Sequence, residues 1–257
     1  PSNLGVSTGF VKKFIFISGL HRSGTSLLYK ILKEQDEISG LSKTNELEDE
    51  GQHVQTVYKP AYEFGGVGKF GFNIKARLDE NSELINEINR EKLFNEWSRF
   101  WDLEKNILLE KSPPNIIRTR FLQKMFPNSY FINITRHPIA TSIASKKWSK
   151  TSLDELISHW IKCHEIFNED KKMIKNIVNI KYEDLINNNE EILAQLSEFL
   201  NLNIKPTKIE IRKGINDKYF KIWIKKSKSI FTKYRISKII KKHNSDVEKF
   251  DYSLIKL

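Results

Sequence analysis

The sequence is short of the features on which several protein classes depend. Its single cysteine, Cys163, has no partner for a disulfide within the chain, which excludes a disulfide-stapled fold and suits a reducing, cytoplasmic location. The six histidines are scattered, and Cys163 has only His164 beside it, so we expect no metal site. Apolar runs are only a handful of residues long, which excludes a membrane-spanning helix. The first residues lack the pattern of a secretory signal.

The chain does contain enough apolar residues for one sizeable core. With 257 residues, of which 39% are hydrophobic and 29% charged, it is typical of a soluble globular protein, and we expect a single domain over residues 1–257. The charge is uneven, because residues 203–257 contain 16 Lys and Arg against 5 Asp and Glu and so carry the whole net charge of +11. We treat this basic C-terminal segment as part of the same domain. Its field should attract anions to one side of the molecule.

A buried strand followed by a phosphate-binding loop is the strongest local pattern. Residues 14–18 (FIFIS) form an apolar run long enough for a strand buried on both faces. Gly19 and Gly24 then enclose four residues before Thr25 opens a helix, which is the spacing of G-x-x-x-x-G-K-[ST]. Backbone N–H groups of such a loop hold phosphate at the helix N-terminus. Because Thr25 replaces the lysine that reaches the terminal phosphates of a nucleotide, the sequence favours a phosphorylated donor other than ATP.

Short apolar strands alternate with helical patterns along the chain. We predict further strands over residues 107–111, 130–135 and 177–182, and helices over residues 82–104, 113–126, 138–148, 153–161 and 192–200. This alternation predicts an α/β fold, a parallel sheet flanked by helices on both faces. In such sheets ligands bind at the carboxyl ends of the strands. The phosphate loop, Lys111 and Arg136 each follow or end a predicted strand, so we expect them at one edge of the sheet.

Five segments, in order along the chain, resemble motifs of the sulfotransferase family. GLHRSGTS (residues 19–26) resembles the loop that binds the 5′-phosphosulfate of the donor, and TRHPIATSIAS (135–145) resembles the 3′-phosphate motif. YEDL (182–185) with FLNL (199–202) behind it, IRKG (211–214) and FDYSL (250–254) resemble further features of the family. The chain is therefore similar to bacterial P-loop-type sulfotransferases, and the resemblance implies their α/β architecture.

The resemblance also implies a donor, 3′-phosphoadenosine 5′-phosphosulfate (PAPS), used as a co-substrate without a metal. It implies transfer of a sulfuryl group to a hydroxyl or amine, and we expect a carbohydrate hydroxyl as the acceptor. The residues that match the family's donor-binding motifs are Leu20, His21, Arg22, Ser23, Gly24, Thr25, Ser26, Arg136, Ser145, Tyr182, Arg212 and Lys213. Arg offers bidentate geometry to phosphate. Arg22 would also stabilise the charge that builds on the leaving phosphate.

The sequence departs from the family pattern at the 3′-phosphate motif. Family members usually have a serine eight residues after the motif arginine, and this chain has Ala144 there. Ser142 and Ser145 lie nearby on the same predicted helix, and we assign the role to Ser145. The residue Tyr182 is open to two interpretations: it lines the adenosine pocket, as its motif does in relatives, or it is structural.

Transfer to a hydroxyl needs a base, since the proton must leave as sulfur is attacked. The family takes its base, a Glu or His, from the region after the first helix, and here that region offers His53, Glu50 and, behind them, Glu46. The unperturbed pKa of a histidine is about 6.5, whereas a carboxylate needs burial or like-charged neighbours to raise its pKa. Lys111 matches a lysine that some glycan-modifying members use to stabilise charge on the transferring group.

Two other functions compete with sulfuryl transfer. A P-loop kinase would share the loop, but Thr25 in the lysine position argues against it. A basic nucleic-acid-binding protein would suit the charge, but no recognition motif is visible, so we expect no nucleic-acid partner. The basic C-terminal segment mixes lysines with Ile, Phe and Tyr. It fits a helix on a membrane surface, a lid over the donor or a track for an acidic glycan.

Overall fold

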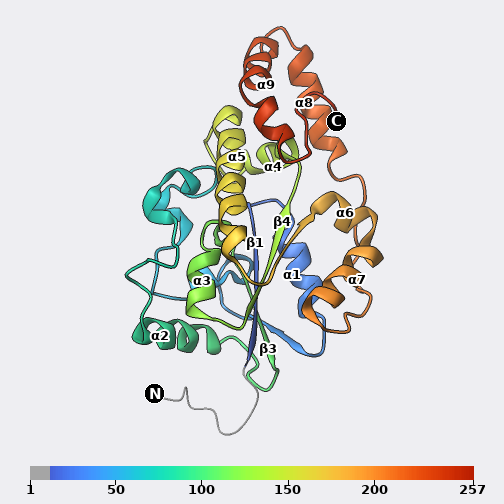
Figure 1. Ribbon diagram of the computed structural model, residues 1–257. Coiled ribbons are helices and arrows are strands. Elements are labelled where there is room, and N and C mark those ends of the chain that lie inside the picture. The colour runs from blue at the N-terminus through green and yellow to red at the C-terminus, as the bar shows by residue number, and fades with distance from the viewer. Residues whose placement is uncertain (1–11) are drawn as a thin grey trace.

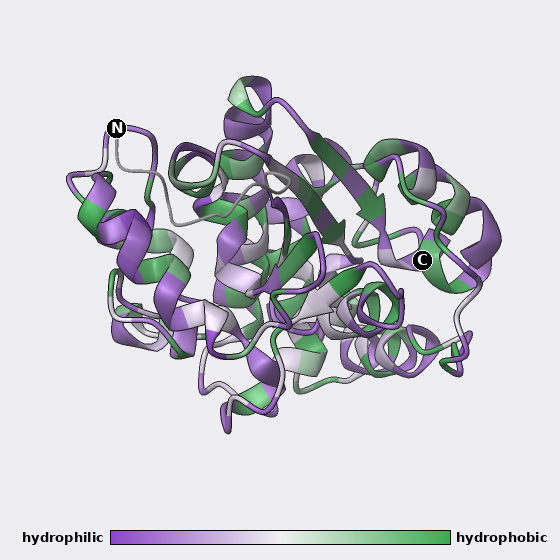
Figure 2. Cartoon of the chain, turned by 90° about the horizontal axis from the view of Figure 1, so that it is seen from below, coloured by the Kyte–Doolittle hydropathy of each residue, from purple (hydrophilic) through white to green (hydrophobic). Residues whose placement is uncertain are grey.

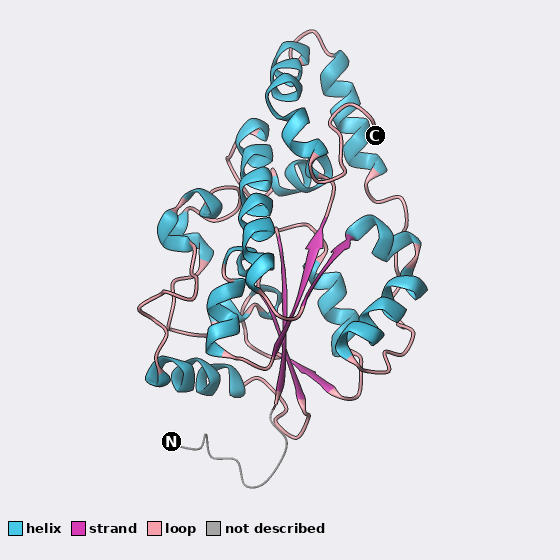
Figure 3. Ribbon diagram, in the orientation of Figure 1, coloured by secondary structure: helices cyan, strands magenta, loops and turns pink. Residues whose placement is uncertain are grey.

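The computed structural model describes residues 12–257, and its centre is a sheet of five parallel strands. The strands lie in the order β2-β3-β1-β4-β5. They are β1 (Lys13–Gly19), β2 (Ile38–Gly40), β3 (Ile107–Lys111), β4 (Ser129–Thr135) and β5 (Ile177–Lys181). All point the same way in Figure 3, so their carboxyl ends share one edge.

Strand β1 lies in the middle of the sheet because its side chains are apolar on both faces. Ile15 and Ile17 are fully buried on one face, and Phe14 and Phe16 face the opposite layer. In Figure 2 the strands are mostly hydrophobic, whereas the surrounding helices carry both hydrophilic and hydrophobic residues. A run that is apolar at every position is what a strand covered on both sides requires.

Helices cover both faces of the sheet, which confirms the predicted α/β class (Figure 1). One layer holds α1 (Thr25–Lys33), α6 (Tyr182–Asn187) and α7 (Asn189–Leu200), which pack on Ile15 and Ile17. The other holds α2 (Glu87–Ser98), α3 (Thr119–Met125) and α5 (Leu153–Asp170). There Trp97 of α2 packs against Phe16 of β1. Phe121 of α3 belongs to the same apolar cluster.

The largest differences from the predicted elements lie at helix ends. The helix expected over 113–126 is a 3-10 turn, Pro113–Ile117, followed by α3, because the backbone of Arg118 leaves the helical region between them. The helix expected over 82–104 is shorter, since the side chain of Asn86 caps α2 by accepting a hydrogen bond from the Asn89 N–H. Strand β5 ends at Lys181, so Tyr182 begins a helix rather than ending a strand.

Three helices stand beyond the carboxyl edge of the sheet. They are α4 (Pro138–Ser145), α8 (Asp217–Lys228) and α9 (Lys233–Glu248), and α8 and α9 form a hairpin that projects from the molecule in Figure 1. Buried Trp223 fixes the hairpin, and its indole N–H donates to the Leu254 carbonyl at 3.1 Å. None of the helices in residues 12–257 combines the length and apolar content needed to cross a bilayer.

Candidate active site

The loop after β1 is closed by its own serine. The N–H of Ser23 donates to the Leu20 carbonyl at 3.0 Å, and the Ser23 hydroxyl accepts from the Leu20 N–H at 3.2 Å. Gly24 follows at a φ of 107°, in the left-handed region, and α1 begins at Thr25. The sequence therefore turns the chain tightly between the end of a buried strand and the first turn of a helix.

The start of α1 is left open towards solvent. The N–H groups of Leu27 and Leu28 both donate to the Gly24 carbonyl, so the amides of Thr25 and Ser26 precede the first intrahelical bond. Among the described residues, no side chain caps this helix, and its first turn holds no acid. Free N–H groups and the positive end of the helix dipole together make an anion-binding site.

Arg136, directly after β4, is buried against this loop. Its guanidinium donates to the Arg22 carbonyl at 2.8 Å and twice to the side-chain oxygen of Asn216, at 2.9 and 2.7 Å. The same group lies over the ring of Tyr182, 4.2 Å from its centroid. Burial lowers the pKa of Arg136 from its usual value, although neighbouring tyrosines and Glu183 oppose the shift. Contacts among residues 12–257 use three of its five N–H donors, which leaves two for a ligand.

Glu183 joins the loop after β4 to the C-terminal segment. One of its oxygens accepts from the His137 N–H at 3.0 Å and from the Asn216 amide at 2.6 Å. The other accepts from the Tyr252 hydroxyl at 2.9 Å. Asn216 and Glu183 were not among the predicted site residues, and no local spacing reveals them, because their contacts join residues 33 to 80 positions apart.

The structure does not bring Arg212 and Lys213 into this network. Both side chains are exposed; Arg212 pairs with Glu210 at 3.4 Å, and Lys213 donates to the Asn187 carbonyl at 3.5 Å. The segment that contains them reaches Arg136 through Asn216 instead. Their assignment to donor binding therefore stays a prediction.

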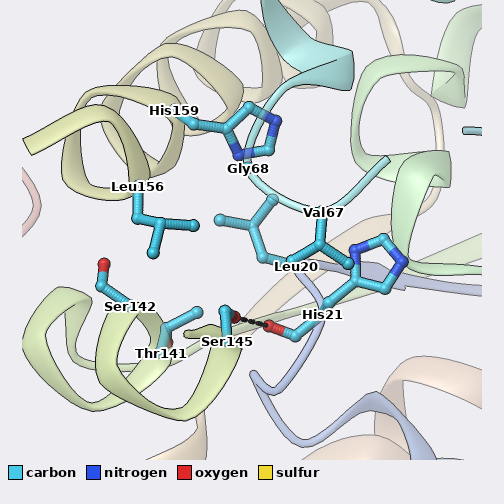
Figure 4. Close-up of a pocket in the computed structure, with 9 residues that line it drawn as sticks. All are labelled: Leu20, His21, Val67, Gly68, Thr141, Ser142, Ser145, Leu156 and His159. Atoms are coloured by element: carbon cyan, nitrogen blue, oxygen red, sulfur yellow. Dashed lines mark hydrogen bonds between the residues drawn. The ribbon is translucent and has the colours of Figure 1, made fainter. Parts of the chain in front are cut away.

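Helix α4 carries Ala144 and the two serines considered in its place. Ala144 is buried in the apolar core, whereas the Ser145 hydroxyl faces the loop and donates to the His21 carbonyl at 3.5 Å. Ser145 lines a small cavity between α4, α5 and the loop, as Figure 4 shows. Ser142 lines the same cavity, and its hydroxyl is buried without a hydrogen-bond partner among the described residues. Both serines are thus close to the loop.

The predicted catalytic side chains Lys111, Glu50 and His53 meet at the end of β3. The ammonium of Lys111, fully buried, donates to one carboxylate oxygen of Glu50 at 3.2 Å. The second oxygen accepts from the Gln52 amide at 2.6 Å and lies 3.7 Å from Nε2 of His53. Glu46, the third candidate base, is exposed and takes no part in this cluster among the described contacts.

His21, in the loop after β1, feels the charges of the Lys111–Glu50–His53 cluster. Burial lowers the pKa of His21, and the charges of Glu50, Lys111 and His53 act on it. The sequence placed His21 only among donor-binding residues. In the structure its ring also lines the small cavity beside α4 and lies at 5.9 Å, edge-on, from the ring of Phe70.

Glu110 holds the segment that carries Glu50 and Gln52. Its fully buried carboxylate accepts from the Gly51 N–H at 3.0 Å and from the Asn115 amide and the Ser112 hydroxyl, each at 2.6 Å. Burial raises the pKa of Glu110 to about 7, although the hydrogen bonds from Ser112 and Asn115 oppose the shift. The sequence gives no sign of this role, because Glu110 lies within a short buried strand and its partners Gly51 and Asn115 are set by the fold.

The fold and these residues define the class of protein. It is a parallel α/β protein with a loop suited to phosphate and, at the same sheet edge, a cluster of carboxylate, imidazole and ammonium groups. The family model described as "Sulfotransferase family" matches residues 15–206. The chain belongs to the sulfotransferase family. No match was found among curated proteins.

Two solved structures have the same fold. Sulfotransferase STF9 from Mycobacterium avium shares 11% identity at a TM-score of 0.52, over 86% of this chain and 70% of that one. Sulfotransferase STF1 from Mycobacterium tuberculosis H37Rv shares 15% identity at a TM-score of 0.51, over 82% and 71%. At these identities the likeness concerns the architecture alone.

The contact between Gly24 and Tyr182 predicts a strict need for glycine. A Cβ at Gly24 would lie 2.4 Å from the Tyr182 ring, whereas at Gly66, also at positive φ, the nearest atom is 3.8 Å away. Both alanine variants pay the cost of left-handed backbone, about 1–2 kcal/mol. Overlap with the ring should add about 2 kcal/mol for Gly24→Ala alone. Urea unfolding of the two variants measures the difference, and equal losses would contradict the close contact.

Glu110 predicts a pH dependence of stability. Its pKa rises from 4.5 in the unfolded chain to about 7 in the folded protein. Between these values the folded protein binds a proton that the unfolded chain releases, so this residue's contribution to the free energy of unfolding falls as pH rises, by about 3 kcal/mol. Glu110→Gln removes the dependence. We expect the stability of the variant relative to the original protein to rise across this pH range in urea titrations; parallel pH curves would contradict the assignment.

Proposed function

We propose that this protein transfers a sulfuryl group from PAPS to an acceptor hydroxyl, and that the acceptor is a carbohydrate. One observation carries the proposal most strongly: in a chain of the sulfotransferase family, an open helix N-terminus lies at the same sheet edge as the Lys111–Glu50–His53 cluster. The helix N-terminus can hold the donor's phosphosulfate. The cluster can accept the proton of the acceptor hydroxyl and stabilise the charge that develops during the transfer.

The proposed transfer needs three actions from these residues. The acceptor oxygen attacks sulfur as the bond between sulfur and the bridging phosphate oxygen breaks, and the bonding electrons leave with the phosphate. The loop amides and Arg22 would stabilise that charge, and Lys111 would do the same for the sulfuryl oxygens. The proton of the hydroxyl would pass to a base, which completes the balance with adenosine 3′,5′-bisphosphate and the sulfated acceptor as products.

Among the candidate bases we favour His53, with Glu50 as the group that orients it. Both oxygens of Glu50 are occupied by Lys111 and Gln52, which leaves this carboxylate poorly placed to receive another proton. His53 is 20% exposed at its side chain, so an acceptor can approach it. Exposed Glu46 stands apart from the cluster.

The other end of the donor would meet Arg136, Ser145 and Tyr182. Two N–H donors of the Arg136 guanidinium have no partner in the described part of the chain, and the ring of Tyr182 already forms a flat surface against the guanidinium. Thr25 starts α1 where a kinase has its lysine, and membership of the sulfotransferase family adds to the argument against ATP chemistry.

The donor prediction can be tested by calorimetry. Adenosine 3′,5′-bisphosphate should bind without a metal and more tightly than ATP, with or without Mg²⁺, because the protein is proposed to hold phosphates at two separate places. A preference for Mg-ATP would overturn the proposal and favour the kinase. Failure to bind either nucleotide would also contradict it.

The assignment of the base predicts a separation of binding from catalysis. His53→Ala should lower the rate of sulfuryl transfer to a carbohydrate acceptor by about 10²–10⁴-fold while bisphosphate binding stays unchanged, since a general base acts on the acceptor. Glu46→Gln is the control and should retain the full rate. Loss of activity in the Glu46 variant, or an unaffected His53 variant, would point to another base.

A further inference from the structure

The tip of the α8–α9 hairpin presents apolar side chains to solvent. Phe231 is 97% exposed, Ile230 82% and Tyr234 70%, and all three lie at the turn between the helices or in the first turn of α9. A cluster of large apolar residues left open in this way marks an interaction surface more often than a chance exposure. We call Ile230, Phe231 and Tyr234 the apolar tip.

Positive charge is dense around the apolar tip, and the only acid that pairs with it among the described contacts is Asp154 of α5, which binds Lys242 at the base of the hairpin. Residues 218–245 contain ten Lys and Arg and no Asp or Glu. Lys228 and Lys233 flank the turn directly and are exposed. The charge continues along the hairpin into a cleft of ≈ 610 Å³ between α9 and the start of α5, whose cations include Lys226, Arg235 and Lys238.

The hairpin holds this surface away from the rest of the protein. Its base is fixed by buried Trp223 in α8 and Ile239 in α9, and His243 contacts Asp154 of α5 at 2.7 Å. The turn lies at the far end from these contacts, at the outermost point of the molecule in Figure 1. The result is a convex, cationic projection with an apolar end.

We propose that the apolar tip docks on an anionic lipid bilayer, with Ile230 and Phe231 at the boundary between headgroups and acyl chains and the flanking lysines on anionic headgroups. Two interactions hold an amphipathic segment on a membrane. Apolar side chains enter the interface between headgroups and acyl chains, and lysines contact acidic lipid headgroups. A second copy of the chain would oppose like charges. An acidic polymer would pair with the lysines but would leave Ile230 and Phe231 in water.

Docking through the tip would also turn the carboxyl edge of the sheet towards the bilayer, because α8 and α9 stand beyond that edge (Figure 1). The proposal depends only on the hairpin and not on the reaction. Membrane binding and sulfuryl transfer can therefore fail separately.

The test is sedimentation with lipid vesicles, using the whole chain. Vesicles of phosphatidylcholine with phosphatidylglycerol should carry the protein down, and phosphatidylcholine alone should not. Ile230→Ser/Phe231→Ser should weaken binding by about tenfold or more, against Ile74→Ser as the control at an equally exposed isoleucine. Lys228→Gln/Lys233→Gln should weaken it by about thirtyfold, against Lys171→Gln/Lys172→Gln as the control of equal charge.

Three results would overturn the proposal. The first is no sedimentation of the original protein with the anionic vesicles. The second is a loss in the lysine variant but none in the apolar variant, accompanied by equally tight binding to soluble heparin, which would indicate an acidic polymer as the partner. The third is equal losses in the control variants. Binding that needs both the apolar tip and its lysines, with bisphosphate binding unchanged in every variant, supports it.

Discussion

The geometry of the site depends on the burial of one cation, Arg136. A buried guanidinium is costly unless its donors are satisfied, and here the satisfying groups come from three distant parts of the chain: the Arg22 carbonyl, the ring of Tyr182 and the side chain of Asn216. Meeting this requirement draws the phosphate loop, the start of α6 and the approach to α8 together. The same Tyr182 ring fills the space above Gly24, so the loop is held from two sides.

A second buried polar network, around Glu110 and Lys111 of β3, positions the segment that carries Glu50 and His53. Glu110 fixes the backbone of Gly51, and its neighbour Lys111 pairs with Glu50, so two successive residues of β3 hold one irregular segment. That segment has no regular strand or long helix to define its position. Hydrogen bonds of the buried Glu110 and Lys111 side chains supply the position instead, which gives His53 a fixed place beside Glu50.

The sequence predicts those parts of the structure whose causes are local. The strand, loop and helix over residues 13–33 follow from an apolar run, two glycines and their spacing, and the parallel order follows from alternation. Strand β2, with three residues, is too short to leave a pattern. The partners Asn216 and Glu183 were missed for another reason: a polar residue satisfied by groups 33 to 80 positions away looks like any surface residue in the sequence.

Two groups of cations in this protein have different roles, one buried at the site and one exposed on the α8–α9 hairpin. Arg136 and Lys111 are buried and paired, so their fields act at short range on a bound ligand. The cations of residues 218–245 are unbalanced by acid within that stretch, so they dominate the field that reaches solvent, over a distance of about 10 Å at moderate ionic strength. Such a field would draw an anionic donor towards this side of the sheet as well as a charged bilayer. A partner that offers only negative charge gives no reason for Phe231 to be exposed. A bilayer, which has an anionic headgroup layer and an apolar layer beneath it, accounts for both the lysines and the apolar tip.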